Sequence, residues 1–225
     1  MELSQCFIFP SSIPFTSTMV SFIPFVVSLF LMTFAHPSLS TNGCPKCGTM
    51  RVPYPLSTSE NCGNPKYKLH CNTTTGLEFI SAEQVYYTIT SIDSKARRLV
   101  LRPPLIDQGT CQSSDLRVGG FRLEDDSPFN ISSRNTVLLL NCSEKILLSP
   151  LDCSSSSICR RFEEKESVCA GLLCCSFLKD ASMTNHRIRV RVEGCSAYTS
   201  LVNLTPGALI DSWKFGIELQ WVQPS

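Results

Sequence analysis

The thirteen cysteines in this chain of 225 residues constrain its fold more than any other sequence feature. Cys6 lies in an apolar N-terminal stretch, which leaves twelve, an even number that can close as six disulfides. Twelve thiols are a liability in a reducing compartment, whereas outside the cell disulfides restrict the unfolded chain and stabilise the fold. We therefore expect all twelve to be oxidised, in a pairing that the sequence does not reveal. They are Cys44, Cys47, Cys62, Cys71, Cys111, Cys142, Cys153, Cys159, Cys169, Cys174, Cys175 and Cys195.

Residues 1–40 have the layout of a secretory signal peptide. The run from Met19 to Ala35 is nearly all apolar and uncharged, and small and polar residues follow it. This run is shorter than the ~20 residues of a spanning helix, so we expect cleavage between residues 35 and 40. An uncleaved signal anchor is the alternative, because no basic residue precedes the apolar core, but Pro24 argues against it. A start at Met1 or at Met19 stays open.

N-glycosylation sequons and the charge balance agree with an extracellular protein. The sequons begin at Asn72, Asn130, Asn141 and Asn203. Without the leader, the chain has 20 basic and 18 acidic residues, a net charge of +2. This small charge excludes the strong overall field of a nucleic-acid-binding protein, so a polyanionic ligand must be held by a local patch.

The sequence predicts a mainly β, disulfide-rich extracellular module with one or two short helices. We expect strands over residues 85–90, 98–102, 136–140 and 217–221, where β-branched and aromatic residues gather. The continuous apolar run of residues 136–140 is typical of a buried strand. Tyr86 and Tyr87 must point to opposite faces of a sheet. The best helix signal covers residues 206–214, with Thr205 as the N-cap and Pro206 at the first position.

The motifs of common enzyme classes are missing from the sequence. Neither G-x-S-x-G nor H-E-x-x-H occurs, and there are 3 histidines. Cys44 and Cys47 have the spacing of half a zinc site or a redox pair, but structural disulfides are favoured in an exported chain with ten further cysteines. The clustered carboxylates of residues 124–126 precede Ser-Pro and indicate a solvated turn. We expect no catalytic residue, metal or cofactor.

Arginines in an alternating pattern are the best candidates for ligand binding. In residues 187–192, Arg187, Arg189 and Arg191 alternate with Ile and Val, which predicts a strand with the three guanidinium groups on one face. Their spacing of roughly 6.6 Å suits a chain of carboxylates, which arginine binds bidentately. An ordinary solvated strand face is the competing interpretation; our hypothesis is that this face binds an anionic polysaccharide. A second, weaker patch consists of Arg97, Arg98 and Arg102.

The cysteine, glycine and proline series resembles the ectodomains of plant wall-associated receptor kinases, in particular the wall-associated-kinase-like subset. The N-terminal matches are Cys44-Pro45-x-Cys47-Gly48, Pro53-Tyr54-Pro55, Cys62-Gly63-x-Pro65, Tyr67-x-Leu69, Cys71, Ile92-Asp93, Leu105 and Cys111. The later matches are Asn141-Cys142, Cys174-Cys175, Cys195-Ser196-Ala197-Tyr198 and the segment from Trp213 to Trp221. Many members have Phe-Gly after Pro-Tyr-Pro, where this chain has Leu56-Ser57. The matching residues carry over as fold determinants only.

The resemblance implies a galacturonan-binding-like module over residues 44–111 and a C-terminal associated region of the same ectodomains over residues 112–225. It further implies non-catalytic binding of pectic galacturonan in the apoplast, at the cell wall or at the cell surface. This sequence has no EGF-like module, membrane span or kinase domain, so we expect no phosphorylation by this product. Contact with a membrane requires an uncleaved signal or an anchor beyond Ser225. The alternative is a protein-interaction or decoy module that binds receptor ectodomains or apoplastic peptides; a secreted enzyme or enzyme inhibitor comes third.

Overall fold

The computed structural model is built mainly of β-strands, as predicted. It describes residues 43–142, 154, 156–166, 183–190, 194–205 and 207–224; the predicted signal peptide lies outside them. The strands are β1 (Cys44–Cys47), β2 (Met50–Val52), β3 (His70–Asn72), β4 (Gly76–Ile80), β5 (Tyr86–Asp93), β6 (Arg98–Leu101), β7 (Phe129–Ile131), β8 (Asn135–Cys142), β9 (Cys195–Val202) and β10 (Ile217–Trp221). The helices are η1 (Pro65–Tyr67), η2 (Leu116–Val118), α2 (Ile158–Glu166) and η3 (Ile210–Ser212). None of these helices is long and apolar enough to cross a membrane.

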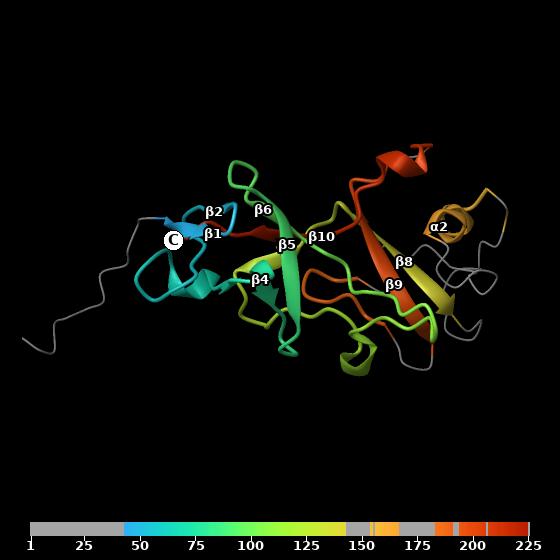
Figure 1. Cartoon of the computed structure of the whole chain (residues 1–225), viewed down its shortest axis with the longest axis horizontal. Helices are drawn as coiled ribbons and strands as arrows, with labels where there is room; N and C mark the ends of the chain where they lie inside the picture. Colours follow the sequence, from blue (N-terminus) through green and yellow to red (C-terminus); the bar gives the residue numbers. More distant parts are fainter. Residues whose placement is uncertain are drawn as a thin grey trace, which may run out of the picture. The chain divides into compact units, whose positions relative to one another are not determined.

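The largest sheet has six antiparallel strands in the order β3-β4-β5-β6-β10-β7. Figure 1 labels β4, β5, β6 and β10 of this sheet. β10 lies between β6 and β7, with Ile217 opposite Leu101 and Trp221 opposite Phe129. The predicted strands over residues 85–90, 98–102 and 217–221 are confirmed as β5, β6 and β10. Strands from before and after residue 111 share this sheet, and the division into two regions at that residue stays a prediction.

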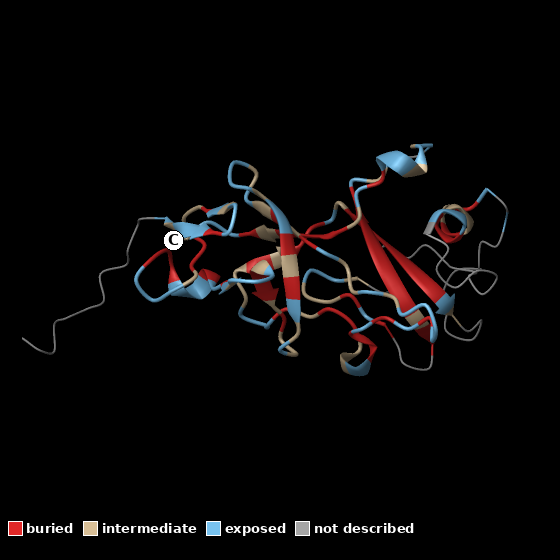
Figure 2. Cartoon of the chain, viewed as in Figure 1, coloured by how far each residue is buried: buried red, intermediate tan, exposed pale blue. Residues whose placement is uncertain are grey.

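Strands β8 and β9 form a separate antiparallel pair whose side chains are buried on both faces. Val137 and Leu139 contribute to the larger hydrophobic core, whereas Leu138 and Leu140 pack in a second cluster with Phe162 of α2. Both strands are coloured as buried along most of their length in Figure 2. A strand covered on both faces needs a continuous apolar sequence rather than an alternating one, which explains the run of residues 136–140.

Alternation is clear where a strand has one exposed face. Tyr86 of β5 is 53% exposed and Tyr87 is 4% exposed, as the strand period predicts. The buried Tyr87 hydroxyl donates a hydrogen bond to Asp115 Oδ2 at 2.8 Å, and the Tyr198 hydroxyl donates to the same oxygen at 2.7 Å. Burial raises the pKa of Asp115, although both hydrogen bonds act in the opposite direction. Asp115 lies at the start of η2, and its Oδ2 accepts hydrogen bonds from Tyr87 of β5 and Tyr198 of β9, so this one oxygen connects the three elements.

Disulfides close the N-terminal part of the fold. Cys44 pairs with Cys62, and Cys47 pairs with Cys71, so the two cysteines of the C-x-x-C sequence have different partners. This pairing confirms structural disulfides in place of a zinc half-site or a redox pair. Cys142 at the end of β8 pairs with Cys195 at the start of β9. Cys111 and Cys159 are also disulfide-bonded; the predicted disulfide cysteines 153, 169, 174 and 175 lie outside the described residues.

The helix prediction was wrong in its position. Of residues 206–214, only the single turn η3 is helical, and Pro206 lies outside the described residues. The α-helix of the described part is α2, which was not predicted from the sequence. Its start signal is Ser157, whose Oγ accepts a hydrogen bond from the backbone N–H of Arg160 at 3.1 Å. This is the bond that an N-cap serine makes.

Candidate functional site

The predicted arginine row lies in an antiparallel ribbon made by residues 119–123 and 186–190. The backbone N–H groups of Ile188 and Val190 donate hydrogen bonds to the carbonyls of Phe121 and Gly119, at 2.8 and 3.0 Å. Arg122 and Arg187 face each other as a bridge pair. Within the described residues 187–190, the predicted regular strand is therefore replaced by isolated bridges; residues 191 and 192 lie outside the described residues. Gly119 and Gly120 have φ of 76° and 94°, outside the β region, and they interrupt a regular ladder.

The alternation of side chains along residues 187–190 is confirmed. Ile188 and Val190 are 0% and 1% exposed and belong to the larger core, whereas Arg189 is exposed. Because paired residues point to the same side of a ribbon, Arg122, Arg187 and Arg189 share the opposite face. We call these three residues the arginine face. Arg191, the remaining residue of the predicted row, lies outside the described residues.

Gly120 is required where the two segments approach each other. It lies opposite Arg189, and a Cβ atom at this position would be 2.4 Å from the Ile188 carbonyl oxygen. No L-residue tolerates this contact together with a φ of 94°. The ribbon therefore depends on a glycine, which leaves no side chain across from Arg189.

The charge of the arginine face is only partly neutralised within the described residues. Arg122 Nε lies 3.4 Å from Glu83 Oε1, and this is the one ion pair that the described part provides to the face. The Nε atoms of Arg122 and Arg187 are buried and have no hydrogen-bond partner there. A buried donor without an acceptor costs free energy. A ligand on the surface would contact the exposed part of these side chains, which for Arg122 is 40% of the side chain. Arginine forks suit carboxylates, which accept two such bonds at once.

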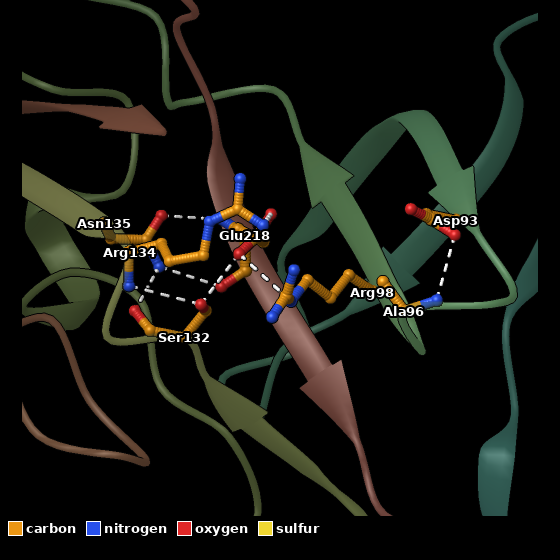
Figure 3. Close-up of polar contacts among 7 residues, drawn as sticks. All are labelled: Asp93, Ala96, Arg98, Ser132, Arg134, Asn135 and Glu218. Carbon is orange, nitrogen blue, oxygen red and sulfur yellow. Dashed lines mark hydrogen bonds and ion pairs between the residues drawn. The ribbon is translucent and has the colours of Figure 1, made fainter. Parts of the chain in front are cut away.

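The second predicted patch has three residues in different surroundings. Arg97 Nη1 donates to Gln223 Oε1 at 3.4 Å, and Arg102 is exposed just after β6. Arg98 Nε lies 3.7 Å from Glu218 Oε1, and Arg134 approaches the same carboxylate from the other side (Figure 3). A ligand contact by Arg97, Arg98 or Arg102 stays a prediction.

The remaining sequence candidates lie on the surface. Residues 124–126 are exposed, and the N–H of Ser127 donates to the Glu124 carbonyl at 3.1 Å, so the predicted solvated turn is confirmed. Asn141 and Asn203 are exposed, and Asn72 and Asn130 are half-buried. Their glycosylation stays a prediction. In the described part, no group of three or more His, Cys, Asp or Glu side chains is placed to hold a metal ion.

Four residues of the candidate sites were not predicted from the sequence: Arg122, Arg134, Lys214 and Glu218. Arg122 stands between Phe121 and Leu123, both buried, and this alternation was the available signal. The two glycines before Phe121 concealed it, since glycine is depleted in strands. For Glu218, the alternation within β10 predicts an outward side chain, whereas the structure covers it to 4% exposure.

Comparison with known proteins identifies relatives for most of the chain. Residues 44–102 match the family model described as wall-associated receptor kinase galacturonan-binding. The chain is 43% identical over 189 residues to wall-associated receptor kinase-like 20 of Arabidopsis thaliana, a match covering 80% of this chain and 29% of the relative. It is 35% identical over 216 residues to wall-associated receptor kinase-like 15 of the same plant, covering 91% of this chain and 34% of the relative. The chain thus spans about a third of the length of these relatives. No solved structure matches it.

Proposed function

Because this chain contains a domain of the wall-associated receptor kinase galacturonan-binding family, we propose that it binds pectic galacturonan outside the cell without catalysing a reaction. The arginine face is the proposed contact surface. Galacturonan carries one carboxylate on each sugar unit, so a row of guanidinium groups complements a row of repeated charges. The protein acts in this proposal as an ectodomain-like module of a wall-associated receptor kinase or as a soluble relative.

The observation that carries the proposal is the excess of arginine over carboxylate on one rigid ribbon. Of the three guanidinium groups, only that of Arg122 forms an ion pair among the described residues, with Glu83. The apolar side of the ribbon is anchored by Phe121 and Ile188, both 0% exposed. A rigid support lowers the entropy that the arginines lose when a ligand binds, which increases affinity.

An extracellular location supports the same proposal. Disulfides Cys44–Cys62, Cys47–Cys71 and Cys142–Cys195 are stable outside the cell and rare in a reducing cytosol. The predicted signal peptide and sequons agree with export. We therefore place the protein in the apoplast, at the cell wall or at the cell surface.

Titration with oligogalacturonides of defined length tests the proposal. The protein is produced in a secretory host, and calorimetry compares wild type with the Arg122→Gln/Arg187→Gln/Arg189→Gln variant. We expect the variant to bind about tenfold more weakly or worse, and wild-type affinity to fall as salt rises. The control variant, Lys46→Gln/Arg51→Gln/Lys95→Gln, removes three exposed positive charges from residues 44–102, the segment that the family model matches. It should keep most of the affinity if the arginine face, which lies outside that segment, is the contact surface.

Equal affinity in the arginine-face variant and in wild type, with both folded, would overturn the assignment of the surface. Absence of binding to any oligogalacturonide in wild type would overturn the proposed ligand. In that case, binding to receptor ectodomains or apoplastic peptides becomes the leading explanation of the fold.

A further inference from the structure

Glu218 forms ion pairs with two arginines, Arg98 and Arg134, neither of which belongs to the arginine face. It projects from β10 and is 4% exposed, with Arg98 Nε 3.7 Å from Oε1 and Arg134 Nη1 3.5 Å from Oε2 (Figure 3). The Ser132 hydroxyl donates a hydrogen bond to Oε1 at 2.7 Å. This buried carboxylate is therefore shared by three side chains.

The backbone of Glu218 is fixed by Asn135, which is 0% exposed. The N–H of Glu218 donates to Asn135 Oδ1 at 2.8 Å, and Asn135 Nδ2 donates to the Glu218 carbonyl at 2.8 Å. Because Asn135 also belongs to β8, these bonds connect the β8–β9 pair to the six-stranded sheet. The carboxylate consequently has a defined position, as a binding site requires.

Positive charge remains on the cavity side of this cluster. Both nitrogen–oxygen distances exceed the usual hydrogen-bond range of about 2.7–3.2 Å, so Glu218 does not saturate either guanidinium group. Arg98 Nε has no hydrogen-bond partner among the described residues. The side chain of Arg134 is 36% exposed and keeps N–H donors for another acceptor. One carboxylate between two arginines leaves a net positive charge.

A cavity of about 350 Å³ opens beside Arg134 and Glu218. Its lining also includes the cation Lys214, the hydroxyl-bearing Ser91 and Ser212, and the aromatic Trp213. Cations complement a carboxylate, hydroxyls complement the hydroxyls of a sugar, and an aromatic ring packs against the apolar face of a sugar ring. The volume lies at the lower end of the ~300–1,000 Å³ typical of small-molecule sites, so a long polymer cannot be enclosed.

We propose that this cavity binds one acidic sugar unit, the end of an acidic glycan chain, with its carboxylate between Arg134 and Lys214. The inference extends the proposed function, on which it rests for the class of ligand. The arginine face then contacts the interior of a chain, and the cavity recognises its end. Glu218 is a positioning residue, because it orients Arg134 without contacting the ligand.

The probe is D-galacturonate, with D-galactose as the neutral counterpart that lacks the carboxylate. Binding is followed by calorimetry and by tryptophan fluorescence. Both tryptophans are core residues, but Trp213 also lines the cavity and Trp221 does not. We expect wild type to bind galacturonate about tenfold more tightly than galactose or better, with a change in fluorescence that Trp213→Phe abolishes. Arg134→Gln and Lys214→Gln should each weaken galacturonate binding about tenfold.

Arg51→Gln, which removes one exposed charge elsewhere, should bind galacturonate as wild type does. If Arg134→Gln fails to fold, Lys214→Gln decides, because Lys214 is exposed. Galacturonate binding that is undetectable in wild type, or equal in wild type and Lys214→Gln, overturns the inference. These results are separate from the test of the proposed function, because the arginine-face variant should still bind galacturonate while losing affinity for long oligomers. If that variant loses long-oligomer binding, and neither wild type nor any variant binds galacturonate, the result rejects the cavity as a binding site and leaves the proposed function standing.

Discussion

Arg122 and Arg187 lie directly opposite each other in an antiparallel β-bridge, which joins two segments that are distant in the sequence. Neither segment forms a regular strand, and backbone hydrogen bonds between residues 119–123 and 186–190 keep the two arginines together. The arrangement of charge therefore depends on backbone geometry at Gly120, which lies beside this pair.

Gly120→Ala should disrupt the ribbon. The added Cβ would lie 2.4 Å from the Ile188 carbonyl oxygen, on a residue whose φ is 94°. We expect the free energy of unfolding to fall by about 2–4 kcal/mol, measured by urea denaturation. Affinity for long oligogalacturonides should fall as well, since Arg187 moves with the backbone.

Gly76→Ala is the matched control for this substitution. Gly76 has a φ of 90° but no heavy atom within 4 Å of its added Cβ, so the substitution introduces backbone strain without a collision. We expect a loss of about 1 kcal/mol and unchanged ligand affinity. Equal destabilisation by the two substitutions would contradict the close approach at Gly120.

The sequence predicted those parts of the fold in which the order of apolar and polar residues within one segment determines which side chains are buried. The strand at residues 136–140 was predictable because both of its faces are covered, and the opposite directions of Tyr86 and Tyr87 follow from the strand period. α2 was missed because only Ile158, Cys159 and Phe162 of its nine residues are apolar, which gives little periodic signal.

The candidate sites were less predictable because they depend on contacts between distant segments. Arg187 and Arg189 were found from their alternation, but nothing local to residues 187–190 indicates that Arg122 lies opposite. The position of Glu218 between Arg98 and Arg134 follows from the pairing of β10 with β6 and β7, a register that propensity does not specify.

Asn135→Ala should destabilise the junction of β8 with β10. The substitution leaves both the N–H and the carbonyl of Glu218 without their Asn135 partners in a buried environment. The Glu218 carbonyl still accepts a hydrogen bond from the Ser132 N–H at 2.9 Å. We therefore expect the free energy of unfolding to fall by about 1–3 kcal/mol in urea denaturation, the desolvation penalty of the N–H that loses its acceptor. Galacturonate binding in the cavity should weaken too, as Glu218 and Arg134 lose their fixed positions.

Asn141→Ala provides the comparison for this loss. Asn141 is exposed, and its Nδ2 donates one bond to Ser196 Oγ at 3.0 Å. Water replaces an exposed bond of this kind, but Asn141 has a φ of 49°, which alanine adopts less readily than asparagine. We therefore expect a loss of about 1 kcal/mol or less. A similar effect of the two asparagine substitutions would show that the Asn135 bonds contribute no more than surface contacts.

Asp115→Asn should change the pH dependence of stability. Burial raises the pKa of Asp115 above its unfolded value of about 3.9, so the folded state favours the protonated carboxyl. The stabilisation from this group is complete below the unfolded pKa and is lost as pH rises through the folded pKa. The neutral amide of the variant undergoes no such loss, so the stability of the variant relative to wild type should increase as pH rises from about 3 toward neutral.

Urea denaturation of both proteins across this pH range makes the measurement. The other carboxylates are common to the two proteins, and their contributions cancel in the difference. A difference that does not vary with pH would mean that Asp115 has the same pKa in the folded and unfolded states.

Removal of the Cys47–Cys71 disulfide should destabilise the N-terminal part of the fold. The bond closes a loop with a sequence separation of 24 residues, and it connects β1 to β3. We expect Cys47→Ala/Cys71→Ala to lower the free energy of unfolding by about 2–4 kcal/mol, because the unfolded chain regains the entropy of the open loop. Stability equal to that of wild type, in a variant with the other disulfides verified by mass spectrometry, would contradict this.

The place of β10 in the sheet determines how much of the chain is needed for folding. The segment matched by the family model ends at residue 102, just after β6, and β6 requires β10 as its neighbour. Disulfides Cys44–Cys62 and Cys47–Cys71 can close during synthesis, yet β6 keeps an open edge until residues 217–221 have left the ribosome. We therefore expect the segment that folds cooperatively to extend beyond residues 44–102, the segment that the family model matches.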